Sequence, residues 1–225
     1  MNWILNIDTA VQTASVCIAH DGQSAGLKIN PSQKDHAAWL HVAIRELLHE
    51  TNITLQDVKA IAVSAGPGSY TGLRVGMSAA KGLCYALNIP LITINTLQMM
   101  AVAALDQPTD LLCPMIDARR MEVFTAVFDQ QLNEVVNTQN CILSSDTFAQ
   151  LLNQHTITFF GNGSNKFQML VHHPHAVFQH IEATAQQLAF LSHIHFEKKQ
   201  YADLAYCEPF YGKEFYSTFL QTAMK

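Results

Sequence analysis

The spacing of hydrophobic residues changes along the chain, and its first part is typical of β-strands. Residues 3–8 are mostly apolar, which indicates a buried strand, and residues 13–19 alternate between apolar and polar positions. Asp21-Gly22 is a tight-hairpin signal, and residues 24–29 follow it as a third strand-like segment. We therefore expect the chain to begin with three antiparallel strands.

The spacing then becomes helical. Ser32-x-x-Asp35 resembles a capping box, and apolar side chains recur at helical spacing from there to Thr51. The elements expected beyond it are a turn at 54–57, a central parallel strand at 60–64, a glycine-rich loop at 65–72, a helix to Leu87, a strand at 91–94 and a helix from Asn95 to Leu105. This order predicts a mixed sheet flanked by helices.

The pattern partly restarts after a polar stretch at 106–110. The elements expected there are strands at 111–117, 122–128 and 134–143, a helix at 145–153, a strand at 156–161, a turn at 161–163, a short helix, a strand near 177–181 and a helix at 183–198. Ile7-Asp8 ends the first strand of one part, and Ile116-Asp117 ends the first strand of the other. We therefore predict two lobes of one duplicated topology, residues 1–108 and 109–225, with both aspartates beside a shared cleft.

Composition narrows the class of protein. Apolar residues make up 49% of the 225 residues, which is enough for a core and excludes a mainly disordered chain. Charged residues reach only 14% and sum to −5, so a free-standing nucleic-acid binder is disfavoured. Uncharged polar side chains, including 17 Gln and 12 Asn, supply much of the surface. Such a surface fits a protein that works against a partner, or an ordinary soluble domain rich in amides.

Features of membrane and secreted proteins are weak. The longest apolar run, Met99 to Leu105, is far shorter than the roughly 18–20 residues of a membrane span. The amino-terminal segment reaches Asp8 before the apolar core of a signal peptide could form. The 5 cysteines are scattered and include no Cys-x-x-Cys pair, which indicates reduced thiols. We therefore expect a cytoplasmic protein without a membrane segment.

The sharpest local motif is the segment 65–76, which reads Ala-Gly-Pro-Gly-Ser-Tyr-Thr-Gly-Leu-Arg-Val-Gly between a buried strand and a helix. Backbone N–H groups at such a position can hold an anion, so Gly66, Gly68 and Ser69 are candidate anion or nucleotide contacts. A tight structural turn is the alternative, because the loop has neither the P-loop nor the dinucleotide-fold spacing. Both interpretations stay open at this point.

Small residues form two lanes along the helix that follows this loop. Each lane has i, i+4 spacing, and the lanes are Gly72/Gly76/Ala80 and Ser78/Gly82/Ala86. Such lanes allow a neighbouring element to approach closely, which offsets the roughly 1 kcal/mol that each glycine costs a helix. One lane can face the sheet, and the other is free for the helix that begins near His36 or for a second chain. Trp39 lies off the apolar stripe of that helix, which hints at a partner surface.

Side chains capable of catalysis are few. Asp8 and Asp117 could hold a magnesium–nucleotide between the lobes, or could cap turns at the ends of their strands. Histidines gather at 172, 173, 175, 180, 193 and 195, but no carboxylate or cysteine accompanies the 172–175 stretch, which favours surface histidines over a metal site. Zinc-peptidase and serine-hydrolase motifs are missing. The segment 172–180 receives no function from the sequence.

Three segments together resemble one known family. They are Ile7-Asp8-Thr9-Ala10 with Ala14-Ser15-Val16, the block from Ser64 to Gly76, and Asp117-Ala118-Arg119-Arg120-Met121-Glu122-Val123-Phe124. They are similar to the TsaB (YeaZ) family of bacterial tRNA threonylcarbamoyladenosine biosynthesis proteins. The resemblance is strong over residues 1–130 and weaker beyond. Glu208-Pro209-Phe210-Tyr211 echoes a family pattern, but Gly212-Lys213 stands where Leu-Arg is expected, which leaves the role of the tail open.

The resemblance implies a two-lobed fold of the actin, hexokinase and heat-shock ATPase type, a ribonuclease H-like duplication with mixed sheets flanked by helices. It also implies a non-catalytic paralogue of the enzyme subunit TsaD, with which it pairs, and the ATPase TsaE joins them. Together they move a threonylcarbamoyl group from its adenylate onto an adenosine beside the tRNA anticodon, so this chain would meet tRNA only through the complex. No resident metal or cofactor is implied, and ATP with magnesium would enter only at the complex interface.

The resemblance also bears on whether this chain catalyses the transfer. The catalytic relative carries a metal-binding His-x-x-x-His at the start of the helix that follows Ile94, where this chain has Thr96 and Met100. A hydroxyl and a thioether are poor replacements for two imidazoles. We therefore expect that the chain does not perform the transfer by itself.

The partner surface implied by the family is the helix pair at 36–49 and 72–87. Its centre is expected at Trp39, Gly72, Gly76, Ala79 and Ala80. A leucine at Gly76 or Ala80 is then expected to abolish pairing with TsaD without unfolding the lobe. A homodimer of the isolated chain through the same helices stays open.

An alternative function comes from another class of protein. A phosphotransferase of the same actin-like superfamily would use Asp8, Asp117 and the loop from Gly66 to Ser69 around magnesium and ATP. Against it, the second lobe is too short to hold a full adenosine-binding subdomain. Tight binding of magnesium–ATP by the isolated chain would support this alternative.

Overall fold

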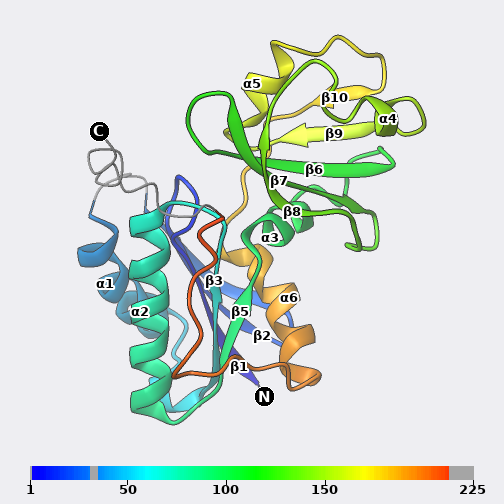
Figure 1. Cartoon of the computed structure of the whole chain (residues 1–225). Coiled ribbons are helices and arrows are strands. Elements are labelled where there is room, and N and C mark those ends of the chain that lie inside the picture. The colour runs from blue at the N-terminus through cyan, green and yellow to red at the C-terminus, as the bar shows by residue number, and fades with distance from the viewer. Residues whose placement is uncertain (1, 31–34, 213–225) are drawn as a thin grey trace, which may run out of the picture.

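A five-stranded mixed sheet forms the framework of the first lobe (Figure 1). The computed structural model describes residues 2–30 and 35–212. In chain order the strands of this sheet are β1 (Trp3–Asp8), β2 (Ser15–His20), β3 (Gln23–Ile29), β4 (Val58–Ser64) and β5 (Leu91–Ile94). They are hydrogen-bonded in the order β3-β2-β1-β4-β5. The first three strands are antiparallel, and β4 and β5 add to β1 in parallel.

A second five-stranded sheet repeats this topology. Its strands are β6 (Leu111–Asp117), β7 (Glu122–Asp129), β8 (Glu134–Ile142), β9 (Ile157–Phe160) and β10 (Ala176–Phe178). They are hydrogen-bonded in the order β8-β7-β6-β9-β10, again with three antiparallel strands followed by two parallel ones. The predicted two-lobed, ribonuclease H-like α/β fold with mixed sheets flanked by helices is therefore confirmed.

Helices cover both faces of the first sheet. The helices are α1 (His36–Glu50), the 3-10 turn η1 (Leu55–Asp57), α2 (Tyr70–Leu87), α3 (Thr96–Val102), α4 (Ala149–Leu152), α5 (Ser164–Gln168) and α6 (Ala185–Glu197). In Figure 1, α1 and α2 lie on one side of the first sheet and α6 lies on the other. None of the helices in the described part of the chain has the length and apolar composition that a bilayer crossing requires.

One apolar core runs through both lobes. It combines residues of the first sheet, of α3, of α6 and of one face of the second sheet, among them Ile4, Ile92, Leu97, Leu112, Phe124, Phe128 and Leu188. A second core lies between the first sheet and the helices α1 and α2. The outer face of the second sheet is closed by an aromatic cluster of Phe148, Phe159, Phe167 and Phe178. The lobes are therefore joined by packing as well as by the chain.

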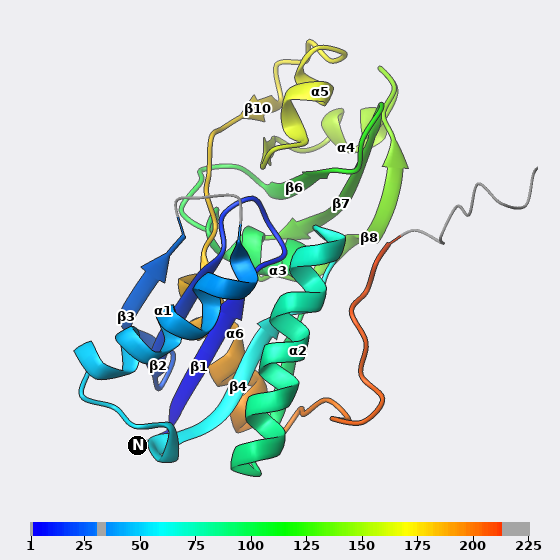
Figure 2. The same cartoon turned by 90° about the vertical axis from the view of Figure 1, so that its left-hand side faces the viewer.

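The last part of the chain returns to the first lobe. Ala185 N at the start of α6 donates to Ser15 Oγ (2.8 Å), and Ala202 N donates to Leu91 O on the edge strand β5 (2.8 Å). Further on, Phe210 N donates to the carbonyl oxygen of Ala65 (2.7 Å). The segment 202–211 runs beside α2 (Figure 2). The predicted division at residue 108 falls between the two sheets, whereas residues 185–212 lie against the first.

Two helix starts differ from the sequence prediction. Helix α1 begins at His36, so Asp35 is its N-cap residue and not the third residue of a capping box, and its side chain makes no capping hydrogen bond. Ser32 lies outside the described residues. Helix α4 begins only at Ala149 because Phe148 has a left-handed backbone (φ 62°). The Phe148 ring contacts Phe167 at 5.7 Å between centroids, so tertiary aromatic packing accompanies the late start.

Helix α2 approaches the end of β1 closely through its glycines. Thr9 Oγ1 donates a hydrogen bond to Gly72 O (2.7 Å). A Cβ atom at Gly72 would overlap the carbonyl oxygen of Thr9, and one at Gly76 would overlap its hydroxyl. By contrast, a Cβ atom at Gly82 would have nothing within 4 Å. The lane formed by Gly72, Gly76 and Ala80 therefore faces the sheet.

The inward-facing Gly72 and the outward-facing Gly82 are expected to respond in opposite ways to substitution by alanine. Gly72→Ala should lower the free energy of unfolding by about 1–3 kcal/mol, because the Thr9 carbonyl belongs to rigid backbone. Gly82→Ala should raise it by up to about 1 kcal/mol, because the new side chain meets no neighbour and alanine favours the helix. Urea denaturation of both variants measures the difference. Equal stabilities would contradict the close approach at Thr9.

Candidate functional site

Two backbone amides of the glycine-rich loop donate hydrogen bonds to other groups of the protein. Gly66 N donates to Thr96 Oγ1 (3.1 Å), and Ser69 N donates to Ala10 O (2.7 Å). Gly68 packs so tightly on Ala10 that an added Cβ would overlap its carbonyl oxygen. The hydroxyl of Ser69 accepts from the Gly72 amide (3.3 Å) and thereby caps α2. This geometry favours the tight-turn interpretation of Gly66, Gly68 and Ser69 over an anion site.

Asp8 is fully buried at the end of β1. Its Oδ1 accepts hydrogen bonds from Ser64 Oγ (2.5 Å) and from Ala10 N (3.0 Å). Its Oδ2 is also buried and has no hydrogen-bond partner among the described residues. Burial raises the pKa of this carboxyl from 3.8 to about 6, although the bonds from Ser64 and Ala10 oppose the shift. Asp8 therefore acts as a buried hydrogen-bond acceptor rather than an exposed ligand for a cation.

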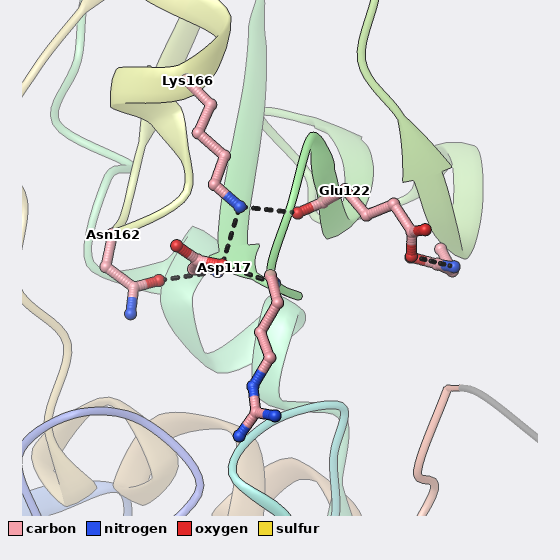
Figure 3. A network of polar contacts seen from close by, with 6 residues as sticks. Asp117, Glu122, Asn162 and Lys166 are labelled. Carbon is pink, nitrogen blue, oxygen red and sulfur yellow. Dashed lines mark hydrogen bonds and ion pairs between the residues drawn. The ribbon is translucent and has the colours of Figure 1, made fainter. Parts of the chain in front are cut away.

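Asp117 belongs to an exposed polar network at the end of β6 (Figure 3). Lys166 Nζ donates to Asp117 Oδ1 (2.7 Å) and to the carbonyl oxygen of Glu122 (3.1 Å). The same Oδ1 accepts from Arg119 N (2.6 Å), and Asp117 N donates to Asn162 Oδ1 (2.9 Å). Partial burial opposes ionisation, but the contacts with Lys166 and Arg119 hold the pKa of Asp117 below its ordinary value. The turn-capping interpretation accounts for these contacts.

A cavity of about 460 Å³ lies between the lobes. It is lined by the loop 11–13, by Met100 and Ile116, by part of the segment 161–168 and by the segment 178–184. Asp8, Asp117 and the candidate loop residues Gly66, Gly68 and Ser69 do not line it. The prediction that the two aspartates face one cleft is therefore wrong. Asp8 is buried at the end of β1, and Asp117 is paired with Lys166.

A groove follows the outer side of α1 and α2, and we call it the α1–α2 groove. It consists of two adjoining hollows of about 520 and 350 Å³ that share His41 and Leu83. Besides these two, the larger hollow is lined by Ala37, Arg74, Val75, Ser78, Ala79 and Gly82. The second small-residue lane, which contains Ser78 and Gly82, is thus the lane that faces outward.

Most of the predicted partner residues do not line this groove. Gly72, Gly76 and Ala80 are buried toward the sheet, so a leucine at Gly76 would meet Thr9 instead of a partner. Ala79 lines the groove but is itself only 8% exposed, and Trp39 is half-buried against the core beneath α1. Both lanes have the same spacing, so the sequence carried no signal for which of them faces outward.

Thr96 and Met100 are both used in packing. Thr96 Oγ1 accepts the amide of Gly66, and the methyl group of Met100 lies close to Gly161. In the described ranges, no group of three or more His, Cys, Asp or Glu side chains is placed to hold a metal ion. Of the 172–180 histidines, His175 Nδ1 contacts Leu152 O (2.8 Å), and the His180 and Glu182 side chains form an exposed pair (3.4 Å).

The chain is similar to known proteins over most of its length. A family model described as "TsaD: tRNA N6-adenosine threonylcarbamoyltransferase" matches residues 25–207. A solved Pseudomonas aeruginosa protein with similarity to peptidase YeaZ aligns with a TM-score of 0.82 at 25% identity, covering 95% of this chain and 100% of that one. YeaZ from Pseudomonas aeruginosa aligns with a TM-score of 0.78 at 24% identity, covering 94% and 100%.

Sequence relatives agree with these structures. The tRNA threonylcarbamoyladenosine biosynthesis protein TsaB of Bacillus subtilis (strain 168) is 33% identical over 144 residues, which is 63% of this chain and 62% of that protein. TsaB of Escherichia coli (strain K12) is 34% identical over 135 residues, 59% of this chain and 57% of that protein. The matches thus span less than two thirds of either relative.

The duplicated two-lobed fold defines the class, which is an actin-like α/β protein with a cleft between its lobes. The chain belongs to the TsaD family and, within it, to the TsaB/YeaZ proteins. The resemblance seen in the sequence is therefore confirmed.

The buried Asp8 carboxyl predicts a pH dependence of stability. Its pKa is higher in the folded chain than its ordinary value of 3.8, so its contribution to stability is complete below about pH 3.8 and is lost as the pH rises through about 6. Asp8→Asn keeps an acceptor for Ser64 but does not ionise. The stability of this variant relative to wild type should therefore rise by about 2 kcal/mol between pH 4 and pH 7.

Chemical denaturation at several pH values measures this relative stability. Asp129→Asn serves as a control of opposite sign, because hydrogen bonds from Asn133 lower the pKa of Asp129. Its stability relative to wild type should fall as the pH rises through the range in which Asp129 ionises. A pH-independent difference between Asp8→Asn and wild type would contradict the raised pKa.

Proposed function

We propose that the chain takes part in tRNA threonylcarbamoyladenosine biosynthesis as a non-catalytic subunit that activates a TsaD-like partner. The partner would transfer the threonylcarbamoyl group onto the adenosine beside the anticodon, with a TsaE-like ATPase completing the complex. In this proposal the protein works in the cytoplasm and meets tRNA only through the complex. Family membership supports the pathway, since the TsaB relatives of Bacillus subtilis and Escherichia coli carry its name.

The observation that carries the non-catalytic role is the use made of Thr96 and Met100. These positions correspond to the metal-binding histidines implied for the catalytic relative. In this chain the Thr96 hydroxyl accepts the Gly66 amide, and Met100 is buried beside Gly161. Hydroxyl and thioether groups engaged in this way are poor ligands for iron or zinc. The chemistry would therefore belong to the partner.

The α1–α2 groove is the surface that best fits this partner. Its walls are largely small or apolar, and Gly82 leaves open space in which another helix can approach closely. Arg74 lies at one end of the groove, where its guanidinium stacks on Tyr70 at 4.2 Å from the ring centroid. Arginine and tyrosine are the side chains that most often dominate binding energy in protein interfaces. A homodimer of the isolated chain would use the same groove.

The proposal assigns no resident cofactor to the chain. The Gly66 and Ser69 amides of the glycine-rich loop donate hydrogen bonds to Thr96 and Ala10, and Asp8 is buried. These contacts also count against the phosphotransferase alternative, which needs the same groups around magnesium and ATP. Nucleotide would enter only at the interface of the assembled complex.

Reconstitution tests the proposed role. The TsaD-like subunit is combined with the TsaE-like ATPase, the adenylate-forming enzyme and tRNA, with and without this chain. We expect modified adenosine to form only when the chain is present, and none to form when the chain replaces the TsaD-like subunit. Modification by the chain without its partner, or an unchanged rate when it is omitted, would overturn the proposal.

A substitution in the groove tests the partner surface. Gly82→Leu should weaken pairing with the TsaD-like subunit at least roughly tenfold, because the added side chain fills the hollow between the helices. It should not unfold the lobe, since a Cβ atom there meets nothing and leucine favours a helix. Affinity is measured by calorimetry, and tRNA modification by the reconstituted system.

The matched control places the same side chain elsewhere. Ala149→Leu adds leucine to an exposed position of α4 in the second lobe, away from the groove. It should leave both pairing and modification unchanged. Wild-type pairing by Gly82→Leu would show that the groove is not the partner surface, and a loss with Ala149→Leu would show that the effect is not local.

A further inference from the structure

The hairpin that joins β6 to β7 holds two adjacent arginines in an unfavourable backbone conformation. Arg119 and Arg120 have φ angles of 68° and 50°, both in the left-handed region. This region is costly for a residue with a long side chain, and glycine or asparagine is usual there. Neighbouring contacts impose it, because Arg119 N donates to Asp117 Oδ1 (2.6 Å) and Glu122 N donates to Arg119 O (3.1 Å). The turn therefore carries arginine where another residue would cost less.

Packing does not explain this choice of residues. Arg119 and Arg120 are both exposed, and within residues 2–30 and 35–212 neither guanidinium group makes a hydrogen bond or an ion pair. Neither side chain lines the interlobe cavity or the α1–α2 groove. Strained backbone of this kind clusters at sites that bind or catalyse. The pair is therefore available to a partner.

Lys166 fixes the base of this hairpin and pairs with its carboxylate. The ammonium group donates to Asp117 Oδ1 (2.7 Å) and to the carbonyl oxygen of Glu122 (3.1 Å), so it links the ends of β6 and β7 (Figure 3). Asp117 N also donates to Asn162 Oδ1 (2.9 Å). Because Asp117 is already paired with a lysine, the two guanidinium groups keep their charge for an external anion.

Few other cations of the chain are placed to meet such an anion. The whole chain has only 13 lysines and arginines. Arg45 and Arg74 line the α1–α2 groove. Lys28 is paired with a carboxylate of α1 (2.6 Å), and Lys81 Nζ donates to carbonyl oxygens of the segment 202–211. Four cations of the first lobe are thus engaged elsewhere.

One other pair of adjacent cations occurs in the sequence. Lys198 and Lys199 close α6, and Lys199 also has a left-handed backbone (φ 53°). There the conformation has a structural reason, because Gln200 N donates to His195 O (2.9 Å) in the usual ending of a helix. The arginine pair ends no helix. The lysine pair therefore supplies a matched control for charge and for backbone.

We propose that Arg119 and Arg120 bind the phosphate backbone of tRNA in the assembled complex. The inference rests on the proposed function, which brings tRNA to this chain through its partner. Each guanidinium group is always charged and can donate two parallel hydrogen bonds to phosphate oxygens. Such contacts position the RNA without reading its sequence. Two of them are too few to hold RNA alone, which agrees with the net charge of −5.

Two observations favour RNA over an acidic protein surface. The proposed function already supplies a polyanion, and neither arginine lies in the groove proposed for the protein partner. The arginines also stand at the tip of a hairpin whose base is held by Lys166, so their positions are fixed before RNA arrives. A contact fixed in advance loses little conformational entropy on binding.

Binding of unmodified tRNA to the complex of this chain with the TsaD-like subunit tests the proposal. Arg119→Asn/Arg120→Asn removes both charges and keeps a residue that accepts the left-handed backbone. We expect the variant complex to bind tRNA roughly tenfold more weakly at about 0.15 M salt, and the slope of log affinity against log salt to fall by about two. Arg119→Lys/Arg120→Lys keeps both charges and should restore the slope.

Thermal denaturation of the same asparagine variant separates function from folding. Because the strained backbone is relieved, the Tm of the isolated chain should rise by roughly 1–4 °C. A variant that is more stable yet binds tRNA more weakly has lost a contact and not its fold. An unchanged or lower Tm would show that the arginines suit the turn, and this result would overturn the proposal.

The control variant is Lys198→Asn/Lys199→Asn. It removes two adjacent cations, one of them in a left-handed backbone, and should leave tRNA affinity and the salt slope unchanged. An equal loss with this control would show a diffuse charge effect. Weaker binding of the TsaE-like ATPase by the arginine variant, with tRNA affinity unchanged, would assign the pair to a protein surface. Either result overturns the proposal.

Failure of this inference can be told apart from failure of the proposed function. If wild-type chain does not pair with the TsaD-like subunit or does not support modification, the proposed function is wrong. If the complex of the Arg119→Asn/Arg120→Asn variant forms normally and binds tRNA with wild-type affinity and salt slope, only the assignment of the arginine pair is overturned.

Discussion

The close approach of helix α2 to the end of strand β1 is the contact on which the rest of the arrangement depends. Thr9 can bond to Gly72 O only because neither Gly72 nor Gly76 carries a side chain. This approach brings the preceding loop onto Ala10, which accepts the Ser69 amide. The same rotation of α2 that turns Gly72 inward turns Gly82 outward. One steric constraint thus holds the loop in a tight turn and leaves the Ser78/Gly82 lane of the helix facing outward.

Uncharged side chains predominate on the two hollowed surfaces that remain available, although Arg74 and Arg45 line the groove. The carboxyl of Asp8 is buried, and Asp117 and Lys166 neutralise each other at the end of β6. What is left around the interlobe cavity is mostly amide, hydroxyl and apolar, and the groove is lined mainly by small and apolar side chains. Several of the amide side chains that are abundant in the chain therefore lie around the interlobe cavity.

Local sequence patterns predicted the fold well, since each strand and hairpin depends mainly on residues close together in the chain. The late start of α4 was not predictable, because it accompanies the packing of Phe148 on Phe167 from another element. The orientation of the two small-residue lanes of α2 was not predictable for a similar reason. Two lanes of small residues on α2 are equivalent in sequence, and only Thr9, on a distant strand, determines which faces inward.

The candidate loop shows the same limit. Its glycines permit an anion site or a turn, and the acceptors that decide between them are Ala10 and Thr96 on other elements. The interlobe cavity could not be seen from any single segment, because Gln12, Gln168 and Gln179 come together only when the lobes pack. Sequence reasoning therefore identified which residues were unusual, while tertiary contacts determined what they do.

The return of residues 185–212 to the first lobe has a consequence for synthesis. One face of the first sheet is covered by α6, whose Leu188, Ala189 and Leu191 are buried. The edge strand β5 and the loop at Ala65 receive their last hydrogen bonds from Ala202 and Phe210. A nascent chain that has released only the first lobe therefore still exposes an apolar sheet face to the ribosome surface and to chaperones. Completion of the first lobe must wait until nearly the whole chain has left the exit tunnel.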